Sequence, residues 1–489
     1  METLYPALTV ITPLIFAFVV GIVSWINKKI CFWLALLSLI VAFISSLKIL
    51  FYIITTSSIV QYKLGGWPPP IGIEYRIDWL NGLILPIISF VALLNLIASK
   101  RFMEKEFKEK ESFFYILYLL FTTGLLGVVI TGDLFNLYVL LEITSLTAYS
   151  MIAMGGTGRS YLASLNYLFL GVIGASFYLL GVGYVYIKTG SLNMVDVFRI
   201  LPHIYNSETV LVGFIFCMVG VWIKMGLFPL HTWLPNAYTF SPISVSRIIA
   251  PLMTKVMIYV MIRVMFSVFG RWYVLGRLYG VNEFVVLLAS CAIIVGGILA
   301  LSQRDIRKVL CYIIVSEIGY MVGGAWLGNP NGLIGAILHI LNDMLMTFCL
   351  FLAFGNVFYT RKKTKIEDLK GLFGEMPYTS AGLVLVGLSI IGIPPTCGFF
   401  SKWYLILGAL QAKDHFFAVS LILSSLINVI LFFRFFEIGL FSKASYKKEA
   451  PVSMIVPLFI VSLMLIVVGI CSGSIVNKII NEFVLVALG

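Results

Sequence analysis

The stretch GVWIKMGLFPLHTWLP, residues Gly220–Pro235, carries two features that a membrane-spanning helix ordinarily avoids. Lys224 places a cation in an apolar segment, where a centrally placed charge costs at least ~2.5–3.5 kcal/mol on insertion scales. Pro229 removes a backbone hydrogen-bond donor and breaks the helix. The freed carbonyl groups are tolerated at membrane depth where they line a watery cavity. We therefore predict a hydrated pocket beside Lys224, with His231 as a secondary candidate; the alternative is a proline kink beside a lysine that snorkels to the surface.

The composition indicates a polytopic α-helical membrane protein. Of 489 residues, 60% are hydrophobic and 11% are charged, and the mean hydropathy is +1.03. A soluble chain of this length could not cover such a surface with polar groups. We attribute the net charge of +12 to Lys and Arg in cytoplasmic loops, so the expected partner is the lipid bilayer and not a nucleic acid.

Hydropathy over windows of about 19 residues predicts an all-α fold of about fourteen transmembrane helices. The seventh and twelfth spans are too long for one straight crossing, and both contain prolines. The predicted spans are 4–25, 30–53, 79–98, 113–131, 134–154, 161–187, 208–240, 243–268, 283–301, 305–326, 332–358, 379–411, 416–440 and 453–471.

Lysine and arginine set the predicted orientation. Loops after odd-numbered spans hold 19 of these residues, against 8 in the loops after even-numbered spans and the tails. Because cytoplasmic loops carry the excess, Lys100–Glu111 and Arg361–Glu375 are predicted to be cytoplasmic. Both termini are then extracytoplasmic, as is Tyr62–Asp78, a hairpin loop whose glycine pair and proline run cannot be helix. The expected location is the plasma membrane.

Five predicted spans each carry one ionisable group at depth, namely Glu142, Lys224, Lys255, His339 and Lys402. Such groups usually face the bundle interior and have a partner or water. Each alone could be a structural ion pair, but one group on each of five helices is hard to explain as five separate accidents. Acid and base groups in series are what a proton relay needs, because burial disfavours the charged form of a lysine and eases its deprotonation.

The stretch GIPPTCGFFSK, Gly392–Lys402, repeats the combination in the twelfth span, with Pro394 and Pro395 as the breaks. The lysine precedes the break in the seventh span and follows it in the twelfth. That reversal is expected of two inverted copies, with spans four to eight mirrored by nine to thirteen. The predicted organisation is 1–110 for helices one to three, 111–270 and 271–440 for the two five-helix repeats, and 441–489 for the last helix and tail.

These segments resemble the antiporter-like subunits of respiratory complex I and of Mrp cation/proton antiporters. KMGLFPLHTWLPNAYTFSPISVS at 224–246 and GIPPTCGFFSKWYLI at 392–406 resemble the broken-helix motifs of that family. TGDLFNLYVLLEITSLTAYSMIA at 131–153 and LMTKVMIYVMIRV at 252–264 resemble the D subunit of Mrp antiporters and its homologue in archaeal membrane-bound hydrogenase and sulfane reductase complexes. The resemblance runs from about Tyr75 to about Arg434.

The resemblance implies fourteen helices, inverted five-helix repeats and a hydrated charged axis at mid-membrane depth. By motif position, Glu142 matches the family's essential glutamate and Lys224 its paired lysine. Lys255 matches the linking lysine of span eight, His339 the histidine of span eleven, and Lys402 the terminal lysine.

The chain departs from the family pattern at four positions. Asp343 and Thr347 stand where the family often has a second histidine and a lysine, and Glu317 stands where glutamine is usual. Arg247 is an unusual charge near the start of span eight. The link from span eleven to the terminal lysine is then expected to run through Asp343 and water, or to carry a cation. The added carboxylates favour Na⁺ handling, because hard cations prefer oxygen ligands.

The favoured hypothesis is an ion-translocating, antiporter-like subunit that works with other membrane subunits and moves H⁺, with or without exchange for Na⁺. The seven cysteines are scattered singly and form no C-x-x-C pair, so we expect no metal and no redox or catalytic cofactor in this chain. The parent complex is left open between an Mrp antiporter and a redox-driven hydrogenase, sulfane reductase or complex I-like enzyme. The alternatives are an independent transporter of an organic solute and a structural subunit that has lost transport, an outcome that Thr347 keeps open.

Overall fold

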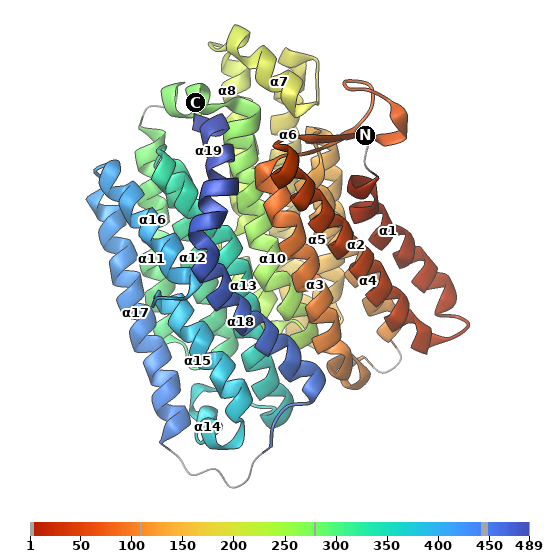
Figure 1. Ribbon diagram of the computed structural model, residues 1–489, viewed down its shortest axis with the longest axis vertical. Helices are drawn as coiled ribbons and strands as arrows, with labels where there is room; N and C mark the ends of the chain where they lie inside the picture. The colour runs from red at the N-terminus through yellow and green to blue at the C-terminus, as the bar shows by residue number, and fades with distance from the viewer. Residues whose placement is uncertain (1–3, 108–109, 278–279, 442–447, 489) are drawn as a thin grey trace.

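The computed structural model describes residues 4–107, 110–277, 280–441 and 448–488. Lys108, Lys443 and Lys447, which contribute to the predicted orientation, lie outside the described residues. The chain folds into a bundle of long helices, most of which run roughly along the vertical axis of Figure 1. Helices suit these apolar segments because they satisfy every backbone polar group internally, where lipid offers no hydrogen bonds.

Thirteen helices within the described ranges are long and apolar enough to cross a membrane, so the predicted membrane class is confirmed. The twelfth predicted span is instead a pair of 15-residue helices, and the total of about fourteen crossings stays a prediction. The thirteen are α1 (Tyr5–Val23), α2 (Lys28–Thr56), α3 (Trp79–Glu106), α4 (Glu111–Ile130), α5 (Leu134–Ala153), α6 (Gly158–Thr189), α8 (Glu208–Met225), α10 (Ile243–Ile262, continued by the π-helical η3, Arg263–Phe269), α11 (Val281–Ser302), α12 (Ile306–Trp326), α13 (Pro330–Arg361), α17 (His415–Leu440) and α18 (Val452–Ile475).

Two helices are interrupted where the sequence has its prolines. Helix α8 ends at Met225 and α9 (Trp233–Phe240) begins beyond Pro229. Helix α15 (Pro377–Ile391) ends before Pro394 and Pro395, and α16 (Cys397–Gln411) follows them. Each first half ends on a left-handed glycine, Gly226 at φ 75° and Gly392 at φ 95°, a conformation that closes a helix and costs glycine no Cβ clash.

The last helix is longer than its apolar core suggests. The predicted span ends at residue 471, yet α18 continues through the π-helical η6 (Val476–Ile480) into α19 (Asn481–Leu488), a run of 37 residues from Val452. Polar residues such as Asn477, Lys478 and Glu482 lower the hydropathy without stopping the helix. Hydropathy therefore located the most apolar part of this helix and underestimated its length.

One end of the bundle carries both termini. Figure 1 shows the N-terminus, the C-terminus and the short surface helix α7 (Met194–Ile200) at its upper end, with α14 (Leu372–Glu375) at the lower end. The predicted hairpin loop holds a two-stranded antiparallel sheet, β1 (Val60–Lys63) with β2 (Glu74–Ile77), in which Val60 pairs with Ile77. The prediction of an all-α fold is correct for the membrane part, and this hairpin is the addition.

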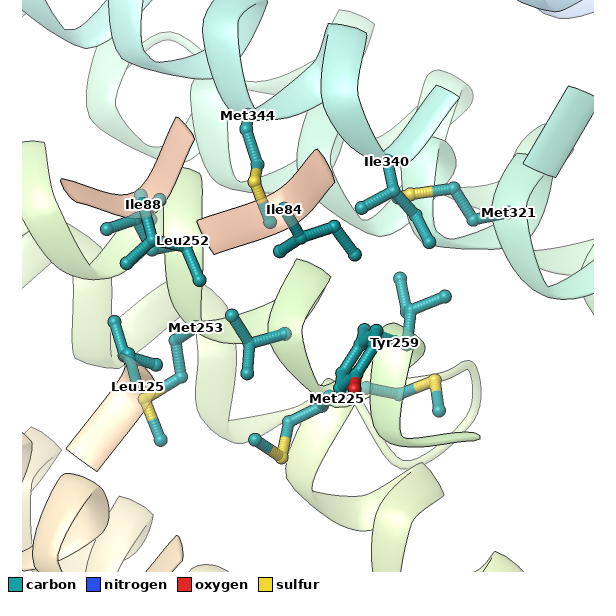
Figure 2. Packing of buried hydrophobic residues seen from close by; sticks show 14 of the residues in the cluster. Ile84, Ile88, Leu125, Met225, Leu252, Met253, Tyr259, Met321, Ile340 and Met344 are labelled. Atoms are coloured by element: carbon teal, nitrogen blue, oxygen red, sulfur yellow. The ribbon is translucent and has the colours of Figure 1, made fainter. Parts of the chain in front are cut away.

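Helices α10 and α13 form the centre of the bundle. Every residue in the most apolar window of each is buried, whereas half or fewer are buried in peripheral helices such as α6 and α11. Figure 2 shows part of this core, in which side chains of α10 lie among side chains from α3, α4, α8, α12 and α13. Tight apolar packing fixes the rotation of each central helix, and this sets where its few polar side chains point.

Topology can be tested with introduced cysteines. In a chain that lacks reactive native thiols, Lys105→Cys and Lys363→Cys should not be labelled by a membrane-impermeant thiol reagent in intact cells. Both positions lie in loops that are predicted to be cytoplasmic because they are rich in Lys and Arg. Ile71→Cys, in the 82%-exposed tip of the hairpin at the other end, should be labelled and serves as the matched control. Labelling of Lys105→Cys and Lys363→Cys but not of Ile71→Cys would reverse the predicted orientation.

Candidate functional site

The first buried pair joins α5 and α8. Lys224 Nζ donates to Glu142 Oε1 at 3.0 Å and to Ser145 Oγ at 2.7 Å. The lysine side chain is 2% exposed, whereas the Glu142 side chain keeps 23% of its surface exposed. The pair is therefore closed on the lysine side and open on the glutamate side.

The second pair lies at the contact of α10 with α13. Lys255 Nζ is 3.0 Å from Asp343 Oδ2 and donates to Thr347 Oγ1 at 3.3 Å, and the threonine hydroxyl donates to Asp343 Oδ1 at 2.7 Å. Lys255 also donates to the carbonyl oxygen of Ala250 at 3.2 Å. Both charged side chains are almost fully buried, so removal of either would leave the other without a counter-ion.

The third pair joins α12 and α13. His339 Nε2 is 2.5 Å from Glu317 Oε2, and His339 Nδ1 is 2.9 Å from Ser401 Oγ on α16. If the ring is neutral, Nε2–H donates a hydrogen bond to the Glu317 carboxylate, and Nδ1 accepts one from the Ser401 hydroxyl. The second oxygen of Glu317 is buried and has no hydrogen-bond partner among the described residues. A buried carboxylate oxygen of this kind is a suitable hydrogen-bond acceptor for a buried water molecule.

The terminal lysine is held by the broken helix. Lys402 Nζ donates to the carbonyl oxygens of Ile390 and Ile391, at 2.6 and 3.5 Å, and to Ser425 Oγ at 3.3 Å. These carbonyls are in the last turn of α15, where the helix ends and its own amide donors run out. The negative end of the α15 dipole also favours a cation at this place. Lys402 Nζ further lies 5.1 Å from the ring centre of Tyr320, within range of a cation–π interaction.

Helix α13 supplies one side of this arrangement. His339, Asp343 and Thr347 are spaced by four residues, so they lie along one face of the helix. The sequence places Asp343 between His339 and Lys402 as an expected link, but its partner in the structure is Lys255 on α10. Tyr320 lies beside both His339 and Lys402: its ring centre is 5.1 Å from that of His339 and 5.1 Å from Lys402 Nζ.

Two secondary candidates lie apart from these pairs. His231 stacks on Phe228 with ring centres 5.4 Å apart, and its Nδ1 has no hydrogen-bond partner among the described residues. Arg247 is fully buried on α10 and donates to the carbonyl oxygens of Phe351 and Leu352, not to any of the charged groups above. Neither residue makes an ion pair within 4 Å in the part of the chain that the structure describes.

One buried ion pair is not among the residues predicted from the sequence. Arg263 makes a two-pronged contact with Asp78, with both N–O distances at 2.5 Å, and donates through Nε to Tyr259 Oη at 2.8 Å. These groups line a cavity of about 420 Å³ between the foot of the β1–β2 hairpin and α19. The available signal was the spacing, since Lys255, Tyr259 and Arg263 follow at four-residue intervals inside the predicted span 243–268.

Comparison with known proteins gives consistent results. Residues 131–428 match the family model described as NADH:quinone oxidoreductase/Mrp antiporter, TM. The chain is 39% identical over 437 residues to the N subunit of an NADH-quinone oxidoreductase from Desulforudis audaxviator, an alignment that covers 86% of each chain. It is 28% identical over 388 residues to the D subunit of a Na(+)/H(+) antiporter from Bacillus subtilis, covering 79% of this chain and 77% of that one.

Two solved structures share the fold. A chain of the archaeal membrane-bound sulfane sulfur reductase superposes with a TM-score of 0.90 at 26% identity, covering 99% of this chain and 98% of that one. A chain of the Mrp complex from Dietzia superposes with a TM-score of 0.86 at 21% identity over the full length of both chains, which shows the fold alone.

The Asp78–Arg263 contact should stabilise the fold. Asp78→Ala leaves a buried guanidinium without its partner, which costs about 3–5 kcal/mol, and also removes the side-chain cap at the start of α3. We expect a clearly lower midpoint of thermal unfolding for the purified protein in detergent. Arg76→Met, in the same cavity wall, should leave the midpoint near that of the parent, because Arg76 makes no ion pair in the described ranges. Equal midpoints for the two variants would show that the contact contributes nothing.

Proposed function

Because this chain belongs to the NADH:quinone oxidoreductase/Mrp antiporter transmembrane family, we propose that it carries H⁺ through the membrane along the buried groups that run from Glu142 to Lys402. It is an antiporter-like, multi-pass membrane subunit whose relatives are subunits of multisubunit Mrp and respiratory complexes. We further propose that it lies in the plasma membrane with both termini outside.

We call the three buried pairs together with Lys402 the row. One observation carries the proposal: in each pair of the row, a carboxylate contacts a base that can give up its proton. Glu142 holds Lys224, Asp343 holds Lys255, and Glu317 holds His339. An ion pair with a purely structural role does not need a base that releases its proton. Arginine, which keeps its proton, would hold such a pair together better. Across the row, the bases are lysine and histidine, the two that exchange protons most readily when buried.

The geometry suggests how a proton would move. A proton that arrives on the exposed side of Glu142 neutralises the carboxylate, and Lys224 then loses the negative partner that supports its charge. A buried lysine without a counter-ion releases its proton at low cost. Lys255 can accept this proton only as the free amine, so its own proton must first move on toward His339. His339 and Glu317 continue the row to Lys402.

The pairing favours H⁺ over Na⁺ as the ion on this path. Sodium prefers oxygen ligands, but the oxygens of Asp343 already contact an ammonium and a hydroxyl. A sodium ion would have to displace both. Exchange of H⁺ for Na⁺ by the whole complex is the second candidate, because a relative is named as part of a Na(+)/H(+) antiporter. The parent complex is either such an antiporter or a redox-driven enzyme.

Removing either end of the first pair should stop transport. We expect Glu142→Gln or Lys224→Ala to abolish proton movement, because the first acid or base of the row is lost, while assembly with the partner subunits remains intact. Vesicles that hold the whole complex are energised with its own redox substrate or with a Na⁺ gradient, and a fluorescent pH dye reports the proton movement. Ser145→Ala, which removes only a hydroxyl from Lys224, is the matched control and should keep most of the activity.

The alternatives predict different outcomes. Near-normal transport by Glu142→Gln would favour a structural subunit that has lost transport. Uptake of an organic solute by the purified single chain would favour an independent transporter.

Lys402 should mark the exit of the row. It is the last lysine buried at depth among the described residues, and the end of α15 supplies its acceptors. Lys402→Ala should stop net transport in the same vesicle assay, whereas Lys402→Glu should retain part of it, since a carboxylate also exchanges protons. Normal transport by Lys402→Ala would place the exit elsewhere, with Asp343 the next residue to test.

A further inference from the structure

A second buried cation lies on α10, away from the row of pairs. Arg247 is 0% exposed and precedes Lys255 by eight residues, about 12 Å along the helix axis at about 1.5 Å per residue. Helix α13 runs alongside in the opposite direction, since Lys255 contacts Thr347 and Arg247 contacts Phe351 and Leu352. Arg247 thus lies between the Lys255–Asp343 pair and the end of the bundle at which α10 begins.

The surroundings of Arg247 are built for a guanidinium without a counter-ion. It donates to carbonyl oxygens of α13 at 3.3 and 3.4 Å and to Asn356 Oδ1 at 3.0 Å, and Phe102 of α3 lies 4.8 Å from it. A Cβ at Gly355 would lie 2.2 Å from Nη2, so the glycine makes room for the group. All of these acceptors are neutral.

No carboxylate neutralises this charge at close range. Within the described ranges, no Asp or Glu oxygen lies within 4 Å of Arg247, and its Nη1 has no hydrogen-bond partner. Glu106, at the end of α3, attracts both Arg247 and Arg307 from beyond 4 Å and accepts from Ser244 Oγ at 3.4 Å. Arg307, a partly buried cation near this end, donates to the carbonyl oxygens of Thr239 and Ser241. The positive field of Arg247 therefore reaches into the α10–α13 contact.

We propose that Arg247 is a fixed positive charge that excludes cations from the α10–α13 contact, and so closes the row of buried pairs at Lys255 toward the end of the bundle where α10 begins. The inference rests on the proposed function, because the barrier matters only if cations move along the row. Two unit charges about 12 Å apart in a medium of effective dielectric constant about 20 shift the occupancy of the site by roughly tenfold. An arginine suits the task because it does not release its proton and so cannot join the relay.

Asn356 allows the charge to be tested apart from the packing. Asn356→Asp replaces the amide by a carboxylate of the same shape, 3.0 Å from the guanidinium. If Arg247 only ties α10 to α13, the new ion pair strengthens the tie and the protein should behave as before. If its uncompensated charge is the barrier, the carboxylate cancels that charge and the barrier fails. Asn356→Leu is the matched control, which removes the hydrogen bond and leaves the charge.

The measurement is passive proton leak, made without any energy source. Vesicles that hold the complete complex receive an acid pulse, and a trapped pH dye reports the decay. We expect Asn356→Asp and Arg247→Met to increase the leak roughly tenfold, and Asn356→Leu to stay near the parent value. A proton leak of the Asn356→Asp variant at the parent value, or equal leak from Asn356→Asp and Asn356→Leu, would overturn the proposal. Should Arg247→Met fail to assemble, the two Asn356 variants still decide.

The outcome is separable from that of the relay itself. Loss of driven transport in Glu142→Gln together with a tight Asn356→Asp variant would keep the relay and reject the barrier. A leaky Asn356→Asp variant together with normal driven transport in Glu142→Gln would reject the relay from Glu142 and leave a cation barrier at Arg247.

Discussion

The contact between Lys255 and Asp343 is the interaction on which the centre of this molecule depends. Both side chains lie between two helices that are buried along their membrane length, so neither charge can turn to water. Removing one partner from such a pair costs about 3–5 kcal/mol, because the other charge is left uncompensated. Helices α10 and α13 must therefore pack in the one rotation that brings the two together, and the apolar core of Figure 2 has to fit that rotation.

The four buried bases differ in what holds their protons, and in the proposed relay this difference would set a direction. Lys224 contacts a partly exposed carboxylate, and Lys255 contacts a buried carboxylate and a buried hydroxyl. His339 contacts a carboxylate whose second oxygen has no hydrogen-bond partner in the described ranges. Lys402 has backbone carbonyls, which cannot take up a proton. In the part of the chain that the structure describes, no Asp or Glu oxygen lies within 4 Å of Lys402 Nζ, which suits the end of the proposed relay. Because α15 ends before the proline pair, its last carbonyl oxygens have no helical partners and accept hydrogen bonds from Lys402.

Much of the fold could be predicted from residues with strong local effects. Pro229, Pro394 and Pro395 break helices wherever they occur, and the long apolar runs locate the membrane segments. Partners are harder to predict, because pairing depends on the rotation of two helices about their axes. The sequence predicts a link through Asp343 and water from span eleven to Lys402, which stays a prediction, and it does not indicate the contact of Asp343 with Lys255 on α10. Arg263 escapes prediction although it lies inside a predicted span, since its partner Asp78 comes from a loop end that hydropathy does not report.

Helix α13 uses a single face for contacts with three neighbours: His339 toward α12 and α16, then Asp343 and Thr347 toward α10. Successive residues of a helix are about 100° apart around its axis. One residue inserted between His339 and Asp343 would turn everything beyond it by that angle and carry both the carboxylate and the hydroxyl away from Lys255. Substitutions here change one contact at a time, but an insertion or deletion undoes the register of the whole face. The length of this helix between its polar residues is therefore as strict a requirement as their identity.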